Sequence, residues 1–201
     1  MATFVLVHGA WHGSWCWKRV RRLLQGQGHE VFTPTLTGVA DRSHLISRDI
    51  DLGSFIPDVV GMIAKKAGVH GIGIEQQIAA GTPPVHGDPR HLQQVLVNLL
   101  NNAIDATIAR HGASGGAIRI ESGFSQNRHI TIKVSDNGTG ILAENLKKIF
   151  TPFFTTKPVG KGTGLGLSVC YGIIDKMGGS LSVASQENVG TTFTIRLPSS
   201  G

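Results

Sequence analysis

The sequence predicts an α/β fragment of strand, helix, strand and helix, followed by an α+β two-layer sandwich with a mixed sheet and helices on one face. Two observations predict this division. Up to about residue 64, short apolar runs alternate with helical patterns, which is typical of parallel strands. From about residue 68, strands joined by short turns alternate with helices. We therefore expect two domains, residues 1–64 and residues 65–201.

Composition indicates a globular chain without a membrane segment. Hydrophobic residues make up 40% of the 201 residues and charged residues 16%. No apolar run reaches the ~18 residues of a membrane helix, and Phe4 to Val7 is too short for a signal peptide. We therefore expect a cytoplasmic protein that contacts no membrane. Cys16 and Cys170 lie far apart, which predicts neither a metal pair nor a disulfide.

The charge balance gives a weak indication of the ligand. The formal net charge is +6 and the pI about 9.7. A nucleic-acid binder would gather Lys and Arg in a stripe with exposed aromatic residues. Here the basic residues are scattered and aromatic residues make up only 6%. We expect no nucleic-acid partner, whereas a modest positive bias suits a polyphosphate.

The first segment alternates strand and helix patterns. We expect strands at Thr3 to Val7 and His29 to Thr33, and helices at Ser14 to Leu24 and Asp51 to Ala64. Pro57 interrupts the early part of the second helix. Two strands separated by a helix are typical of a parallel pair.

Two stretches, FVLVHGAWHGSWCW and GHEVFTPTLTGVADRSHL, resemble the N-terminus of α/β-hydrolases of the plant esterase and hydroxynitrile-lyase type. The resemblance implies that the backbone N–H of Ala10 would help to form an oxyanion hole. The nucleophile of that family lies on a strand-turn-helix elbow, G-x-S-x-G. The literal match, Gly112 to Gly116, follows a predicted helix and precedes a predicted strand. We expect a fragment without nucleophile, acid and base, and esterase or lyase activity is the alternative.

Two further features of this segment bear on its role. His8 and His12 have the spacing of a metal pair, but they lie on a strand end and a turn rather than a helix, which disfavours a metal. A hydrolase fragment would also expose strand edges and an apolar face. We infer an engineered or accidental fusion.

From about residue 68, the sequence pattern predicts a sheet with three helices. The expected strands are Val69 to Ile78, Ala117 to Phe124, His129 to Ser135, Ser180 to Ser185 and Thr191 to Leu197. The expected helices are Asp88 to Thr107, Leu142 to Ile149 and Ser168 to Met177. A loop rich in Gly, Thr and Pro runs from Thr151 to Gly166.

The helix from Asp88 to Thr107 has two faces. Apolar residues recur at helical spacing, and Asn98, Asn102 and Asp105 share a second, polar face. Asn is a mediocre helix former, so solvent alone would not favour it there. An amide oxygen can ligate a hard cation or bond a phosphate, although an ordinary solvated face stays the alternative.

Three further pieces follow in order. Asp136 to Gly140, DNGTG, ends a strand, and a carboxylate in this turn could accept a hydrogen bond from the exocyclic amine of adenine; an ordinary β-turn is the alternative. Aromatic residues at Phe150 to Phe154 could anchor a lid from which Lys157 and Lys161 reach a terminal phosphate, unless they only pack in the core. Gly160 to Leu167 directly precedes a helix, where free N–H groups bind anions.

Together the four pieces closely resemble the boxes of histidine-kinase ATP-binding domains, from the superfamily that includes gyrase, Hsp90 and MutL. NLLNNAIDA resembles the N box, DNGTGI the G1 box, FTPFFTTK the F box and GTGLGL the G2 box. The resemblance implies a Bergerat-type sandwich that binds ATP and Mg²⁺, in the pattern of nitrogen-regulator-like sensor kinases.

The resemblance also implies roles for individual residues. Asn102 would ligate Mg²⁺ with Asn98 near the same site, and Asp136 would bind the adenine amine with support from Thr191. Asp105 would border the pocket. The other residues implied to contact the nucleotide are Gly138, Gly140, Ile141, Phe153, Lys157, Lys161, Gly162, Thr163, Gly164, Leu165, Gly166 and Leu167.

Two departures from the pattern limit the expected activity. Asn98 stands where the gyrase branch carries a water-activating Glu, so we do not expect efficient ATP hydrolysis. None of the nine His residues lies in an H-E/D-x-x-[NH]-P-like phosphoacceptor motif. We therefore expect ATP binding alone, with the phosphoacceptor helical hairpin and the response regulator as partners in the parent kinase. A structural fusion with a blocked nucleotide site is the remaining alternative.

Overall fold

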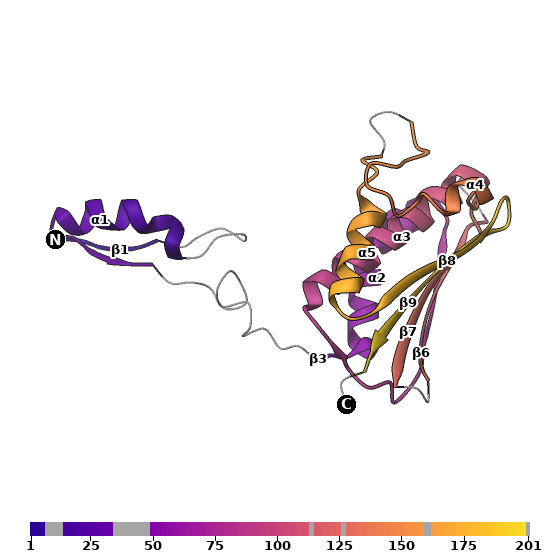
Figure 1. Ribbon diagram of the computed structural model, residues 1–201, viewed down its shortest axis with the longest axis horizontal. Helices are drawn as coiled ribbons and strands as arrows, with labels where there is room; N and C mark the ends of the chain where they lie inside the picture. The colour runs from indigo at the N-terminus through magenta and orange to yellow at the C-terminus, as the bar shows by residue number, and fades with distance from the viewer. Residues whose placement is uncertain (7–13, 34–48, 113–114, 126–127, 159–161, 200–201) are drawn as a thin grey trace. The chain divides into compact units, whose positions relative to one another are not determined.

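The computed structural model describes residues 1–6, 14–33, 49–112, 115–125, 128–158 and 162–199. The chain divides into two compact units, Met1–Ser47 and Arg48–Gly201. The first is a short α/β segment and the second is a mixed sheet with helices on one face (Figure 1). The predicted fold class is therefore confirmed. None of the described helices is long and apolar enough to cross a membrane.

The first unit contains the predicted parallel strand pair. Strand β1 (Thr3–Val5) pairs with β2 (Glu30–Phe32), with Phe4 opposite Val31. Between them lie a 3-10 turn, η1 (Ser14–Trp17), and helix α1 (Lys18–Gly26), all of whose residues stay at least partly exposed. His8, Ala10 and His12, which carry the predicted oxyanion hole and the metal alternative, lie outside the described residues.

The second unit begins with a helix that is longer than predicted. Helix α2 spans Leu52–Val69, and the carboxylate of Asp51 caps it by accepting the N–H groups of Gly53 at 3.0 Å and Ser54 at 3.2 Å. Its buried face joins the core of the second unit through Leu52, Ile56, Val59, Val60, Ile63 and Ala67. The predicted boundary at residues 64 and 65 would cut this helix. The compact units divide between Ser47 and Arg48 instead.

The sheet of the second unit has the order β4-β6-β7-β9-β8. Strands β4 (Gly73–Ile78) and β6 (Ala117–Ser125) are parallel. The antiparallel strands that follow are β7 (His129–Asp136), β9 (Gly190–Pro198) and β8 (Ser180–Gln186). Two shorter strands, β3 (Asp49–Ile50) and β5 (Val85–His86), form a separate antiparallel pair. The predicted strand from Val69 starts only at Gly73, because α2 continues to Val69.

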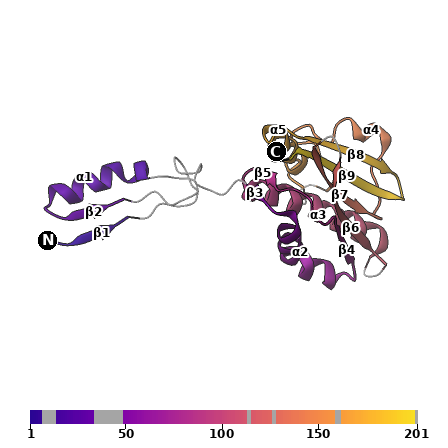
Figure 2. The same ribbon diagram turned by 90° about the horizontal axis from the view of Figure 1, so that it is seen from below.

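Helices α2, α3 (Pro89–His111) and α5 (Gly166–Lys176) cover one face of the sheet, and α4 (Ala143–Leu146) is a single turn (Figures 1 and 2). Alternate residues of the central strands, such as Ile118, Ile120, Ile130 and Ile132, point into the core against these helices. The opposite faces of β6 and β7 carry polar residues. Helix α3 is thus held on its apolar side, and its polar side is free to form a site.

We expect the fragment 48–201 to fold cooperatively without residues 1–47, whereas the fragment 65–201 should lose its stable fold. Removing residues 52–64 takes five buried apolar side chains out of the core. At ~1.5–3 kcal/mol for each buried side chain, the loss is on the order of 10 kcal/mol, which matches the total stability of a typical domain. Thermal unfolding of both fragments by circular dichroism tests this, and a cooperative transition in 65–201 would contradict it.

Candidate functional site

Helix α3 presents the predicted polar face on its exposed side. Asp88 caps the helix by accepting the N–H of Arg90 at 2.9 Å, and Pro89 occupies the first turn. Asn98, Asn102 and Asp105 are all partly exposed, while the apolar residues between them are buried in the core. The helical spacing of α3 therefore directs the side chains of the predicted residues away from the core.

A lysine from the loop before α5 reaches this face. The ammonium of Lys157 donates to Oδ2 of Asp105 at 2.7 Å and to Oδ1 of Asn102 at 3.3 Å. Burial raises the pKa of Asp105, but hydrogen bonds and charges from Lys157 and Lys66 outweigh burial, and the pKa lies below its ordinary value. The structure brings together the predicted residues Asn102, Asp105 and Lys157, with a cation against the amide oxygen of Asn102.

Asn98 has different partners. Its amide N–H points at the sulfur of Cys170 on α5 at 3.7 Å, and its side chain lies beside Gly166 at the start of that helix. Burial raises the pKa of the Cys170 thiol to about 11, so the thiol stays protonated. Asn98 therefore lies at the junction of α3 with the N-terminus of α5, while Asn102 faces Lys157.

Asp136 lies at the end of β7, in a turn where its own side chain bonds the backbone. Its carboxylate accepts the N–H of Gly138 at 2.9 Å and the backbone N–H of Thr191, which is opposite in register on β9. Burial raises the pKa of Asp136 to about 6 despite these two hydrogen bonds. The buried Thr191 hydroxyl contacts Ser185 Oγ at 2.9 Å, and the same Oγ accepts the N–H of Ile141 at 2.8 Å. One hydrogen-bonded group thus joins Asp136, Thr191 and Ile141.

Glycines allow this turn to touch α3 and β8. A side chain at Gly138 would place its Cβ 2.6 Å from the backbone of Ala106, and the N–H of Thr139 donates to the Ala106 carbonyl at 3.2 Å. Gly140 has φ +69° and lies against the Gln186 carbonyl, where a Cβ would collide. Ala106 follows Asn102 by one helical turn. The Asp136 turn is therefore adjacent to the amide face of α3.

Two hollows touch Asp136 in the described part of the chain, and α3 lines neither of them. One, of about 600 Å³, lies among strand residues that include Glu75, Arg119 and Asp136. The other, of about 400 Å³, lies along the β8–β9 turn and includes Ser185 and Thr191. The Asp136 turn is therefore joined to α3 by the backbone contact between Thr139 and Ala106, while Lys157 contacts Asn102 on the amide face.

The segment between α4 and α5 is described at residues 147–158 and 162–165, and these two parts contact each other at Gly162 and Gly164 (Figure 1). The N–H of Phe153, which has φ +67°, donates to the carbonyl of Gly164 at 2.9 Å. Gly162 lies against Thr155 and Lys157, and Gly164 has φ +66°. Thr163 Oγ1 accepts the N–H of Leu165 at 3.3 Å at the start of α5. The predicted lysine at position 161 lies outside the described residues.

The aromatic residues of this loop divide into two groups. Phe150 and Phe154 pack against the core, as does Leu167 at the start of α5, whereas Phe153 is 75% exposed. Anchoring of the loop therefore comes from Phe150 and Phe154.

Three residues that contact the site residues were not predicted from the sequence. Arg110 donates to the carbonyls of Asn137 at 2.8 Å and Val189 at 2.9 Å, which fixes the Asp136 turn to the β8–β9 turn. Ser185 joins Thr191 to Ile141. Lys66 contacts Asp105 from α2 at 3.0 Å. A basic residue in the last turn of α3 was the available signal for Arg110, whereas the other two contacts join distant parts of the chain.

Comparison with known proteins defines the class of this domain. The family described as "Histidine kinase-, DNA gyrase B-, and HSP90-like ATPase" matches residues 87–201, which is more than half of the chain, and the chain belongs to this family. Within it, the relatives are sensor histidine kinases, and the second unit is a histidine-kinase ATPase catalytic domain. Residues 4–92 match the "Alpha/beta hydrolase family".

Individual relatives are similar over most of this chain. The sensor histidine kinase ZraS of Escherichia coli K12 is 40% identical over 156 residues, which is 78% of this chain and 32% of ZraS. The two-component sensor PprA of Pseudomonas aeruginosa is 40% identical over 140 residues, which is 69% of this chain and 15% of PprA. The catalytic domain of histidine kinase ThkA superposes with a TM-score of 0.65 at 34% identity, covering 75% of this chain and 94% of that one.

The extent of these matches bears on helix α2. The chain spans about a third or less of the length of these curated relatives. Because the ZraS match covers 156 of the 201 residues, at most 45 residues lie outside it, and α2 falls within it. The hydrolase match also runs through α2 to residue 92.

We expect the free energy of unfolding to fall as the pH rises from about 4 to about 6. Asp136 has a pKa of about 6 in the folded chain against 3.8 ordinarily, so in this window the folded state keeps a proton that the unfolded state has released. The change is at most about 3 kcal/mol and is complete above the folded pKa. Urea unfolding at several pH values measures it. The Asp136→Asn variant should lack this component, and an unchanged pH profile in that variant would contradict the assignment.

Proposed function

We propose that the second unit binds ATP together with Mg²⁺ and holds the nucleotide as a phosphoryl donor. The observation that carries the proposal is the cation held between Asn102 and Asp105, on the helix that the backbone of the Asp136 turn contacts through Thr139 and Ala106. An amide oxygen that attracts a cation suits Mg²⁺, which prefers oxygen ligands, and a carboxylate can accept a hydrogen bond from the amine of a base. The family of the chain supports ATP as the nucleotide.

Each end of the nucleotide has candidate partners in this proposal. The Asp136 carboxylate, ionised above its pKa of about 6, would accept the exocyclic amine of adenine, with Thr191 and Ile141 at the base. A guanine carbonyl in the same place would repel that carboxylate. The oxygen of Asn102 would hold Mg²⁺, which prefers oxygen ligands. The ability of this oxygen to hold a cation is supported by the ammonium of Lys157, which donates a hydrogen bond to it at 3.3 Å.

The phosphates would meet the start of α5 and the lid lysines. Gly162, Thr163, Gly164, Leu165 and Gly166 lead into the N-terminus of α5, where backbone N–H groups without helical partners favour anions. Lys157 and Lys161 would pair with the terminal phosphate. Asn98 beside Gly166 lacks the carboxylate needed to activate water, so ATP hydrolysis by this unit is expected to be slow.

The acceptor and the partners follow from the relatives, which are named as sensor kinases. In this proposal a histidine on a helical hairpin receives the phosphoryl group and a response regulator receives it next. Transfer of this kind depends mainly on positioning and charge stabilisation. An ATP-dependent domain of this family is expected in the cytoplasm.

We further propose that the chain is a fusion of hydrolase-like and kinase-like segments. Two different families match its two ends, at residues 4–92 and 87–201. In this view the fragment 48–201 binds Mg²⁺-ATP as tightly as the whole chain. Weaker binding by the whole chain would instead favour a blocked site, and turnover of an ester substrate would favour the esterase or lyase alternative.

We expect Asn102→Ala to lose the contribution of Mg²⁺ to ATP affinity, at least tenfold, because the variant removes the proposed metal ligand. Isothermal titration calorimetry with ATP, with and without Mg²⁺, measures this. Gln94→Ala, which removes an exposed amide from the same helix, serves as the matched control and should bind as the unmodified chain does.

The same titration tests the proposed role of Asp136 in binding the adenine base. Asp136→Ala should weaken ATP and adenosine binding alike, at least tenfold, since the hydrogen bond to the amine is lost with either ligand. Normal ATP affinity in this variant would overturn the role of Asp136. No binding heat at millimolar Mg²⁺-ATP with the unmodified chain would overturn the proposed function itself.

A further inference from the structure

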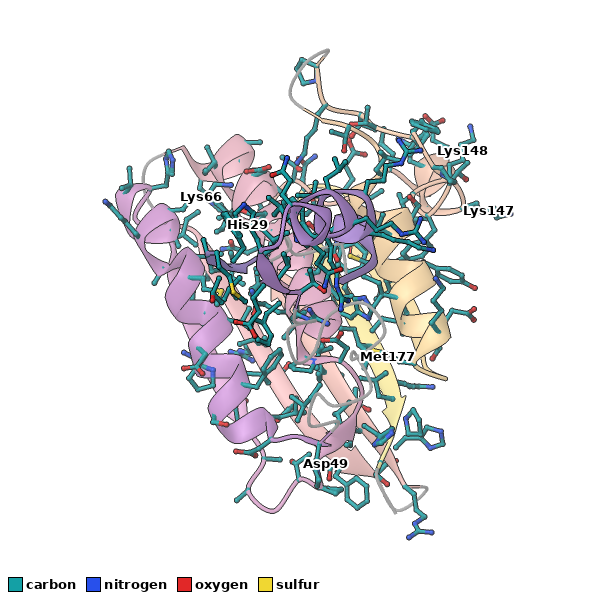
Figure 3. The ribbon with its side chains drawn as sticks, turned by 90° about the vertical axis from the view of Figure 1, so that its left-hand side faces the viewer. His29, Asp49, Lys66, Lys147, Lys148 and Met177 are labelled. Atoms are coloured by element: carbon teal, nitrogen blue, oxygen red, sulfur yellow. The ribbon has the colours of Figure 1, made fainter. Side chains whose placement is uncertain are left out.

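Two lysines contact the carboxylate of Asp105 among the described residues. Lys157 of the lid loop donates to Oδ2 at 2.7 Å, and Lys66 of α2 donates to Oδ1 at 3.0 Å. Lys66 also donates to Oδ1 of Asn101 at 3.0 Å. Figure 3 shows Lys66 near the C-terminal end of α2, beside α3. Each oxygen of Asp105 therefore has its own ammonium group.

The two lysines differ in how firmly they are held. Lys66 lies between Ile63 and Ala67, which are both buried in the core, so its backbone is fixed relative to α3. Lys157 lies outside the helices and strands, in the segment between α4 and α5, and its contact with α3 is made by its side chain. Helix α2 also lies outside the residues 87–201 that the ATPase family matches. Lys66 is thus a fixed cation supplied by a neighbouring element.

The position of Lys157 conflicts with a bound metal. It occupies the Asn102 oxygen to which the proposed function assigns Mg²⁺, and an ammonium and a divalent cation at one oxygen repel each other. Lys157 must therefore leave when Mg²⁺-ATP enters. Asp105, whose side chain is only 38% exposed, would then face the anionic phosphates without that partner.

We propose that Lys66 is a positioning residue for nucleotide binding, which keeps Asp105 neutralised so that Lys157 can exchange from Asp105 and Asn102 to the terminal phosphates. This inference rests on the proposed function. In the nucleotide-free chain Asp105 holds Lys157 next to the proposed phosphate site. Lys66 lowers the electrostatic cost of moving Lys157 away, because Asp105 keeps one cationic partner. The role of Lys66 is therefore exerted through Asp105 and not through contact with ATP.

A double-mutant cycle tests this role. Lys66→Met should weaken Mg²⁺-ATP binding at least fivefold and leave adenosine binding within twofold, because adenosine carries no phosphate. In an Asp105→Asn background, where no carboxylate needs neutralising, Lys66→Met should change ATP affinity less than twofold. Lys66→Arg should restore affinity to within twofold. Lys65→Met, at the exposed neighbouring lysine, is the matched control and should have no effect.

The outcomes separate this inference from the function on which it rests. Normal Mg²⁺-ATP affinity in Lys66→Met overturns the inference and leaves the proposed function standing. An equal loss with and without Asp105, or an equal loss for ATP and adenosine, also overturns it, because Lys66 would then act on the fold or on the nucleotide directly. Thermal unfolding of each variant identifies a loss of fold. Failure of the unmodified chain to bind Mg²⁺-ATP overturns both.

Discussion

The close packing of the Asp136 turn against helix α3 is the constraint on which the site depends. Gly138 lies so close to the backbone of Ala106 that no side chain fits, and the Thr139 N–H donates to the Ala106 carbonyl at 3.2 Å. Arg110, one helical turn further along, binds two carbonyls of the same region. These contacts fix the distance between a carboxylate suited to a base and an amide suited to a metal. In the proposed function a nucleotide would bridge the two, and these hydrogen bonds between the helix and the turn would set the distance that it has to span.

Helix α3 also depends on packing at its apolar face, opposite the site. Its apolar residues pack on the sheet, and α2 and α5 contact it on its flanks. By contrast, the described residues of the first unit form two strands of three residues, a 3-10 turn and one short helix, and leave Val5, Leu23 and Phe32 exposed. Two-stranded sheets are marginal in water. The core that holds the site in place is therefore supplied within residues 48–201.

Features encoded locally could be predicted from the sequence, and long-range ones could not. The polar face of α3 followed from its spacing, its Asp88 cap and Pro89, and the hairpins followed from alternation and turns. The C-terminal end of α2 was missed because the strand was predicted to start at Val69, the residue at which the helix ends. Pro57 in the second turn leaves the helix intact. Asn98 and Asn102 share a face in sequence, yet Asn98 contacts α5 and Asn102 contacts Lys157. Pairings such as Lys66 with Asp105 depend on packing that periodicity does not specify.

The charges at the site explain why a carboxylate can stand beside a proposed phosphate site. An unpaired Asp105 would oppose a triphosphate, since two anions in a partly buried place repel strongly. Hydrogen bonds from Lys157 and Lys66 instead keep Asp105 ionised, with its pKa below the ordinary value despite burial. Lys157, Lys66 and Asp105 together carry a net charge of +1, and in the proposed function only Lys157 would need to move when the nucleotide binds. A site without the carboxylate would attract phosphate as well, but Lys157 would keep only its longer hydrogen bond to Asn102 and would lose its ionic partner.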